Sequence, residues 1–259
     1  MARTSTSATL GSDVYTNVRN AILSGQLPPG AHLKASELRH TFGPVSSSVV
    51  REALSRLTAQ RLVVAKHNQG FFVTDVTVEG IRGLTKVRVL VEGNALRLAI
   101  ENGDFDWESR VVAAHHVLAR TPVRDHSGEG TSEAWAAAHR EFHESLISAC
   151  GIPVLLDICD LLLDGSELYR RVASRVGDPG RDVAREHQEL MELTVDKRAD
   201  EAVEAFRHHV ERTAETVVRA LEERAMSSAG AEADLNLTPP SPTPGGASGA
   251  QVESDGSAR

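Results

Sequence analysis

Hydrophobic residues recur at helical spacing along most of the chain, and the pattern is clearest over residues 46–57. There Val50, Leu54 and Leu57 fall on one face together with Ala53. The other positions form a small, hydroxyl-rich and basic face, made up of Ser47, Ser48, Arg51, Ser55 and Arg56. Such a face suits the major groove of DNA, where hydroxyls reach phosphates or base edges and an arginine can bond guanine. An ordinary surface helix fits the same pattern, so the neighbouring segments must distinguish a DNA-binding helix from a surface helix.

Two shorter helices are predicted before this one. The first is capped by Ser12 or Asp13 and stops in residues 24–30, where two prolines and two glycines prevent a continuous helix. The second begins at Ser36 and is broken at residues 43–44, which are glycine and proline. This second helix and the polar, basic helix that begins at Ser46 are joined by that tight break, and together they predict a helix-turn-helix.

A hairpin is predicted directly after the third helix. Residues 62–64 and 71–73 are apolar triplets, and the polar segment between them contains Gly70. Apolar triplets on either side of a glycine-containing turn are typical of two antiparallel strands. The hairpin would be the wing of a winged helix-turn-helix.

From Val78 onward the pattern predicts six amphipathic helices and no strand. The predicted breaks lie near Gly103, at residues 121–122, at residues 151–153, near Val176 and at residues 196–200, and the last helix ends near Arg224. The predicted caps are Asp106, Ser132, and Asp178 followed by Pro179. The fold class is therefore mainly α, an N-terminal winged helix-turn-helix followed by an all-α helical bundle.

Charge separates these two parts. Residues 1–76 contain eight Lys and Arg against four Asp and Glu, whereas the whole chain contains 28 against 36 and has a net charge of -8. A basic head on an acidic body is typical of a DNA-binding domain attached to a regulatory domain. The predicted organisation is a disordered N-terminus (1–11), a DNA-binding domain (12–75), an effector-binding and dimerisation domain (76–226), and a disordered tail (227–259) that is rich in Pro, Gly and Ser.

The two cysteines form no CxxC pair, and the N-terminus lacks the apolar stretch of a secretory signal. The most apolar run, residues 154–163, is short and interrupted by two aspartates. We therefore expect a reduced, cytoplasmic protein that does not cross a membrane.

The predicted bundle contains four histidines on inward faces. His139 and His143 are four residues apart, so their imidazoles can point to one place, and His187 lies on a face with Leu190. Periodicity selects His209 over His208, because His208 shares its stripe with four glutamates, namely Glu201, Glu204, Glu211 and Glu215. Any one of these histidines could be a hydrogen-bonded core residue. Together they favour a shared divalent metal site, which satisfies several converging imidazoles at once.

Arg88 lies on the core face of the first bundle helix, between Leu84 and Val91. A buried guanidinium requires an anionic partner, which could be Glu92 one turn away or the carboxylate of a bound effector. His115 and His116 are interpreted as packing or solvent-exposed residues.

The N-terminal motifs ILSGQLPPG, ASEL, VVREALSRL and LVVAKHNQGFFV resemble the winged helix-turn-helix of GntR-type bacterial transcription regulators. The resemblance covers about residues 13–74, and Ser47 stands where the family usually has an arginine. It implies that Arg51 contacts DNA, that residues 46–48 open the recognition helix and that Gly70 lies at the wing tip. The candidate DNA-binding residues are Ser36, Ser46, Ser47, Ser48, Arg51, Lys66, Asn68 and Gly70.

The helical part is similar to the ligand-binding domain of the FadR branch of GntR regulators, the six-helix FCD domain, through KVRVLVEGNALRLA, HREFHESLISACG, EHQELM and FRHHVERT. That similarity implies a metal held by His139, His143, His187 and His209, with His139 in the place usually held by aspartate. It also implies that Arg88 binds the carboxylate of an effector. An all-imidazole set favours zinc, nickel or copper over manganese or magnesium, so a divalent metal, zinc or nickel, is the expected cofactor.

These observations predict a ligand-responsive transcription regulator, a repressor rather than an enzyme. We expect a homodimer that binds a double-stranded, pseudo-palindromic DNA operator and responds to a small carboxylate effector bound beside the metal. A metal-free sensor of acyl ligands and a metal-dependent hydrolase are the alternatives. The hydrolase is disfavoured because the chain has no HExxH motif or paired acidic residues to supply a general base.

Overall fold

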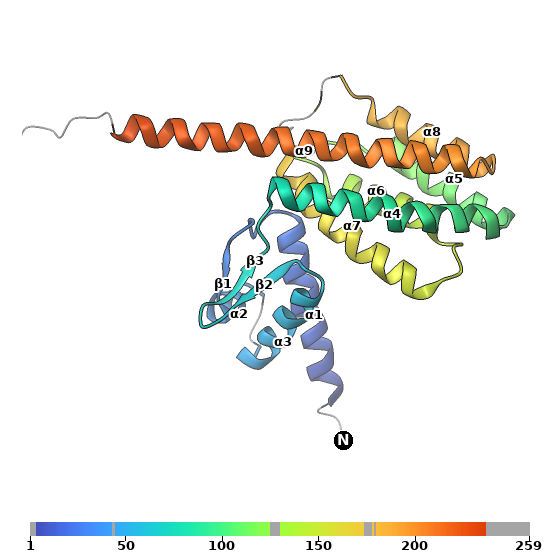
Figure 1. Cartoon of the computed structure of the whole chain (residues 1–259). Coiled ribbons are helices and arrows are strands. Elements are labelled where there is room, and N and C mark those ends of the chain that lie inside the picture. Colours follow the sequence, from blue (N-terminus) through green and yellow to red (C-terminus); the bar gives the residue numbers. More distant parts are fainter. Residues whose placement is uncertain (1–3, 43–44, 125–129, 174–177, 179, 237–259) are drawn as a thin grey trace, which may run out of the picture. The chain divides into compact units, whose positions relative to one another are not determined.

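The N-terminal part of the computed structural model is a small helical domain with a three-stranded sheet (Figure 1). The structure describes residues 4–42, 45–124, 130–173, 178 and 180–236. The first elements are α1 (Thr4–Leu23), β1 (His32–Leu33), α2 (Ala35–Phe42), α3 (Ser47–Ala59), β2 (Val63–Lys66) and β3 (Gly70–Val73). The sheet is antiparallel with the order β1-β3-β2, and β2 pairs with β3 from Val63 opposite Val73 to Lys66 opposite Gly70. This is the predicted helix-turn-helix with its wing.

Helix α3 has the predicted seam. Val50, Ala53, Leu54 and Leu57 are buried in the core of this domain, which excludes water from one side of the helix. Ser46 is its N-cap, because its Oγ accepts a hydrogen bond from the backbone N–H of Val49 at 3.3 Å. The cap fixes where α3 starts, and the buried seam fixes which face is exposed.

The second part contains helices only, apart from one isolated bridge between Arg124 and Thr131 within the described residues. Its helices are α4 (Val78–Asn102), α5 (Phe105–Arg120), α6 (Glu133–Ile147), α7 (Pro153–Ala173), α8 (Val183–Val195) and α9 (Ala199–Asn236). Helix α5 packs against α6 and α8, and α4 packs against α6 and α7. The mainly α prediction, with a winged head and an all-α bundle, is confirmed.

The bundle core is built around Trp107 and Phe142, both fully buried, with Leu96, Leu146 and Leu190 among their neighbours in the cluster. Trp107 packs directly on the backbone at Gly103, where an added Cβ would lie 2.1 Å from the indole Cε3. Only glycine allows this approach, so the α4–α5 corner is set by one small residue and one large one.

Several predicted boundaries are wrong. Helix α1 begins at Thr4 rather than at a cap near Ser12, because a helix that has formed extends at little cost. Asp104, not Asp106, caps α5, and Asp182, not Asp178, caps α8. Helix α9 continues past Arg224 to Asn236, through a segment rich in alanine, the best helix former. The short strand β1 was not predicted.

The described residues beyond Glu222, residues 223–236 at the end of α9, form a unit separate from the rest of the chain. The predicted disordered tail falls partly on the end of α9, which is helical, while residues 237–259 lie outside the described part of the chain. No helix in the described residues is long and apolar enough to cross a membrane.

Candidate metal centre and DNA-binding face

The four predicted histidines come together in the bundle. His139 and His143 lie on α6, His187 lies on α8 and His209 lies on α9. One ring nitrogen from each falls within 4.8 Å of the others. The ring centroids of His139 and His143 are 4.5 Å apart, and those of His187 and His209 are 4.7 Å apart. Side chains from three helices, α6, α8 and α9, thus converge on one point.

Aromatic side chains form the walls around this cluster. The rings of Phe142 and Phe206 lie 5.5 Å and 6.3 Å from that of His143. Trp135, one turn before His139 on α6, stacks on its imidazole with centroids 4.7 Å apart. His143, His187 and His209 are at most 5% exposed, while His139 is partly exposed. The cluster is therefore dry on one side and reaches solvent at His139.

Burial keeps these imidazoles neutral. Desolvation is the largest cause lowering the pKa of His139, His143 and His187 well below the ordinary value of 6.5, and the neighbouring rings add to it. The pKa of His209 is also lowered by burial, although Glu186 acts in the opposite direction. Neutral imidazole is the form that binds a metal ion.

Two buried nitrogens in the cluster have no hydrogen-bond partner. These are Nε2 of His143 and Nε2 of His187. A buried polar atom without a partner costs about 1–3 kcal/mol, so such atoms are rare unless a ligand satisfies them. Two nitrogens bound to one zinc lie at most about 4.2 Å apart, twice a metal–nitrogen bond of about 2.1 Å. The four nitrogens need only a small contraction to reach that range, so the residues fit a divalent ion.

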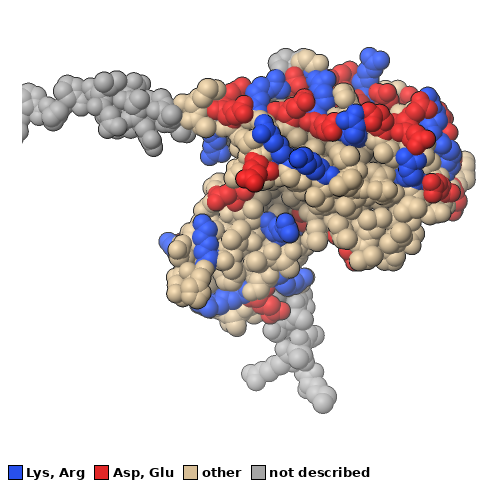
Figure 2. Space-filling view, viewed as in Figure 1, with Lys and Arg blue, Asp and Glu red and all other residues tan. Residues whose placement is uncertain are grey.

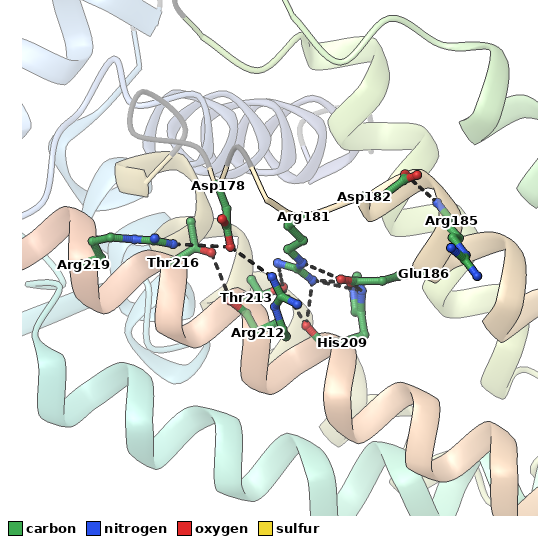
Figure 3. Close-up of polar contacts among 10 residues, drawn as sticks. All are labelled: Asp178, Arg181, Asp182, Arg185, Glu186, His209, Arg212, Thr213, Thr216 and Arg219. Carbon is green, nitrogen blue, oxygen red and sulfur yellow. Dashed lines mark hydrogen bonds and ion pairs between the residues drawn. The ribbon is translucent and has the colours of Figure 1, made fainter.

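His209 is held by a charged pair that sequence reasoning missed. Its Nδ1 lies 2.8 Å from Oε2 of Glu186, and Arg181 donates to both oxygens of that carboxylate (Figure 3). Burial opposes ionisation of Glu186, but the hydrogen bonds from Arg181 and His209 outweigh it and lower its pKa to about 2. In the sequence, only the glutamate beside His187 indicated this pair, and a solvent-exposed charge explains that glutamate equally well.

Arg88 has the intramolecular partner that the sequence allowed. Its Nε and Nη2 donate to the two carboxylate oxygens of Glu92 at 2.6 Å and 2.9 Å, and its Nη1 donates to Ser166 Oγ at 2.8 Å. Arg88 and Glu92 are 6% and 2% exposed, so the pair lies in the core. Arg88, His139 and Arg170 line the same cavity, which places the guanidinium beside the cluster.

The candidate DNA-binding residues are all exposed. Ser46, Ser47, Ser48 and Arg51 lie at the start of α3, Ser36 lies on α2, and Lys66, Asn68 and Gly70 lie on the β2–β3 hairpin. Asn68 and Gly70 have φ of 56° and 98°, which a tight wing turn requires. On the face shown in Figure 2, the head presents more basic than acidic side chains, whereas charges of both signs alternate over α9.

The other histidines stand apart from this cluster. His208 is exposed, as periodicity predicted, and so is His116. His115 is partly buried, and its ring lies 5.6 Å from Phe142. Both assignments of His115 and His116 to packing or solvent agree with this placement.

The chain is similar to known regulators over both parts. Residues 10–73 match the model of the bacterial regulatory proteins of the gntR family, and residues 84–212 match that of the FCD domain. The HTH-type transcriptional regulator BphR of Paraburkholderia xenovorans strain LB400 is 34% identical over 76% of this chain and 80% of its own. The HTH-type transcriptional repressor GlaR of Escherichia coli K12 is 28% identical over 76% of this chain and 91% of its own.

A solved structure has the same fold. A GntR-type transcriptional regulator from Rhodococcus sp. RHA1 superposes with a TM-score of 0.67 at 23% identity, covering 81% of this chain and 98% of the other. At that identity the likeness shows the fold alone.

Proposed function

We propose a function from the premise that the chain belongs to the gntR family of bacterial regulatory proteins and has an FCD domain. The proposed function is that of a repressor controlled by a small organic acid bound at a metal centre. Members of this family are transcription regulators that bind DNA, so the chain is a regulator rather than an enzyme, and the hydrolase alternative is wrong. The metal, the acid, the dimer and the direction of control are the parts we propose.

The exposed start of α3 is the proposed DNA-reading surface. Three serine hydroxyls and the guanidinium of Arg51 share it, and the apolar seam holds the helix in the domain core. Serines would contact phosphates, and Arg51 would contact a base edge or a phosphate. Lys66 and Asn68 of the wing would add contacts with the backbone of the operator.

The test is binding of the full chain to a labelled DNA fragment from upstream of its own gene. Arg51→Ala should weaken binding about tenfold or more, since a good contact to a base contributes about 1–3 kcal/mol. Lys86→Ala is the matched control, because it removes one positive charge from an exposed position of α4. Equal binding by both variants would remove Arg51 from the interface.

The metal proposal rests on one observation, the two unpartnered Nε2 atoms inside a cluster of four neutral imidazoles. A divalent ion would accept a lone pair from each ring and would supply open coordination positions for an oxygen ligand. Four neutral nitrogen ligands favour zinc or nickel, or copper, over magnesium. A metal-free acyl sensor is less well supported, because a long apolar chain would leave these nitrogens unsatisfied.

Elemental analysis of the purified full chain tests this part. We expect about one zinc or nickel ion per subunit. His209→Ala should lower the metal content strongly, whereas His208→Ala, on the exposed side of the same helix, should leave it unchanged. A His143→Ala/His187→Ala variant that keeps full stoichiometry would refute the ligand assignment.

The effector would be a small carboxylate placed between the metal and Arg88. Three of the five N–H groups of Arg88 bond Glu92 and Ser166, which leaves two for an incoming oxygen. In a homodimer on a pseudo-palindromic operator, the acid can alter DNA affinity only through its different affinities for the two arrangements of the heads. The segment around residues 75–79, which includes the start of α4, connects the two domains and is the proposed hinge.

A further inference from the structure

The hydrogen bonds around His209 fix the position of its proton. An ionised carboxylate only accepts, so the 2.8 Å contact between His209 Nδ1 and Glu186 Oε2 requires the hydrogen on Nδ1. Arg181 Nη2 lies 3.3 Å from the same nitrogen, a longer contact between two donors that does not change this assignment. The proton on Nδ1 leaves Nε2 of His209 with its lone pair available for a metal ion.

Arg181 holds the carboxylate and the helix together. It donates from Nε to Glu186 Oε1 at 2.8 Å and from Nη2 to Oε2 at 2.5 Å, so the pair is bidentate. It also donates to the backbone carbonyl of His209 at 2.9 Å and to Thr213 Oγ1 at 3.0 Å (Figure 3). The side chain of Arg181 is 5% exposed. One guanidinium therefore sets both the orientation of Glu186 and its distance from α9.

His209 is distinguished from the other three histidines by this support. Among the described residues, neither His139, His143 nor His187 has a carboxylate at hydrogen-bond distance. His139 is held instead by stacking on Trp135, which fixes the ring plane but not the proton.

We propose that Glu186 and Arg181 are positioning residues that fix the tautomer and orientation of His209 and make it the anchoring ligand of the metal centre. This inference rests on the proposed metal site. A carboxylate behind an imidazole ligand orients the ring and raises its basicity, and its removal typically lowers metal affinity about 10–100-fold. Arg181 acts through Glu186, so the two residues form one unit.

The test is zinc affinity of the full chain, measured by competition with a chelating dye. Glu186→Ala should weaken zinc binding about 10–100-fold, Arg181→Ala should weaken it less, and the double variant should be no weaker than Glu186→Ala. Glu186→Gln should recover part of the loss, because its carbonyl oxygen can still accept from Nδ1–H. Asp178→Asn is the matched control. Asp178 precedes α8 and bonds Arg212 and Arg219 of α9, but it contacts none of the four histidines.

A folded Glu186→Ala variant with unchanged affinity, or an equal loss in Asp178→Asn, would overturn the proposal. The second measurement is the imidazole ¹⁵N spectrum of the chelator-treated protein, with His209 assigned from His209→Ala. The wild type should show the Nδ1–H form and Glu186→Ala should lose it, whereas the same tautomer in both would overturn the role of Glu186. Failure of the wild-type chain to bind zinc would overturn the proposed function instead, and the spectrum would still decide whether Glu186 fixes the tautomer.

Discussion

Replacing Arg88 by methionine should destabilise the bundle strongly. The change leaves the carboxylate of Glu92, which is 2% exposed, without its bidentate partner in the core. Removal of one member of a buried ion pair typically costs about 3–5 kcal/mol, because the other charge stays desolvated and uncompensated. The hydrogen bond from Arg88 to Ser166 is lost as well, and this adds about 1 kcal/mol. We expect Arg88→Met to lower the free energy of unfolding by at least 3 kcal/mol.

The double variant Arg88→Met/Glu92→Leu separates the pair from the rest of the fold. It removes both charges and keeps similar volumes, so its stability should return to within about 1 kcal/mol of the wild type. Both tryptophans of the chain, Trp107 and Trp135, lie in the bundle, so tryptophan fluorescence during urea unfolding reports on this part alone. For an m-value of about 2 kcal/mol per molar urea, Arg88→Met should shift the midpoint by roughly 2 M.

A cost below 1 kcal/mol for Arg88→Met, with no recovery in the double variant, would refute this reasoning. Arg88 would then be held for the effector rather than for Glu92. If the double variant is stable and binds metal but no longer responds to any small carboxylate, Arg88 has both roles.

Three further predictions follow from the same structure. Chelator-treated protein should lose stability as the pH falls below 6.5, because unfolded histidines take up protons there while folded His139, His143 and His187, whose pKa values are lowered, do not. The loss approaches about 1.4 kcal/mol per histidine and pH unit in that window, and a His143→Phe/His187→Phe variant should have a flatter profile in urea unfolding. Zinc at a hundred times its dissociation constant should stabilise the wild type by about 2.7 kcal/mol in the same assay, and His209→Ala should respond far less. Ser46→Ala should cost the head about 1 kcal/mol through loss of the α3 cap, measured by hydrogen exchange of the α3 amides.

The sequence predicts those parts of the fold that depend on one helix at a time. The seam of α3 and the choice of His209 over His208 both follow from which residues share a helix face, and the structure places them as expected. The four histidines could be grouped because each had an inward position and no other obvious role. Spacing alone did not require them to meet, since convergence depends on how α6, α8 and α9 pack.

Where several polar residues could cap the same helix, the sequence does not indicate which one is used. Asp104 and Asp106 are both good caps, and the structure uses Asp104, whose Oδ1 accepts a hydrogen bond from the backbone N–H of Trp107. Asp178 and Asp182 present the same ambiguity before α8, and Asp178 bonds arginines of α9 instead. The choice between two candidate caps depends on tertiary packing, and a local sequence pattern carries no information about that packing.

The presence of a histidine rather than a carboxylate at position 139 determines the charge of the proposed metal centre. An aspartate there would bring a negative charge, whereas a neutral His139 would leave the full charge of a bound divalent ion available to an incoming carboxylate. The pairing of Arg88 with Glu92 points the same way, because the arginine is already compensated and adds little net positive charge. Attraction of an acid would therefore come mainly from the metal. A chelator-treated protein should accordingly bind small carboxylates weakly even with Arg88 intact, and an acid that binds equally well without metal would show that the guanidinium is the main attraction.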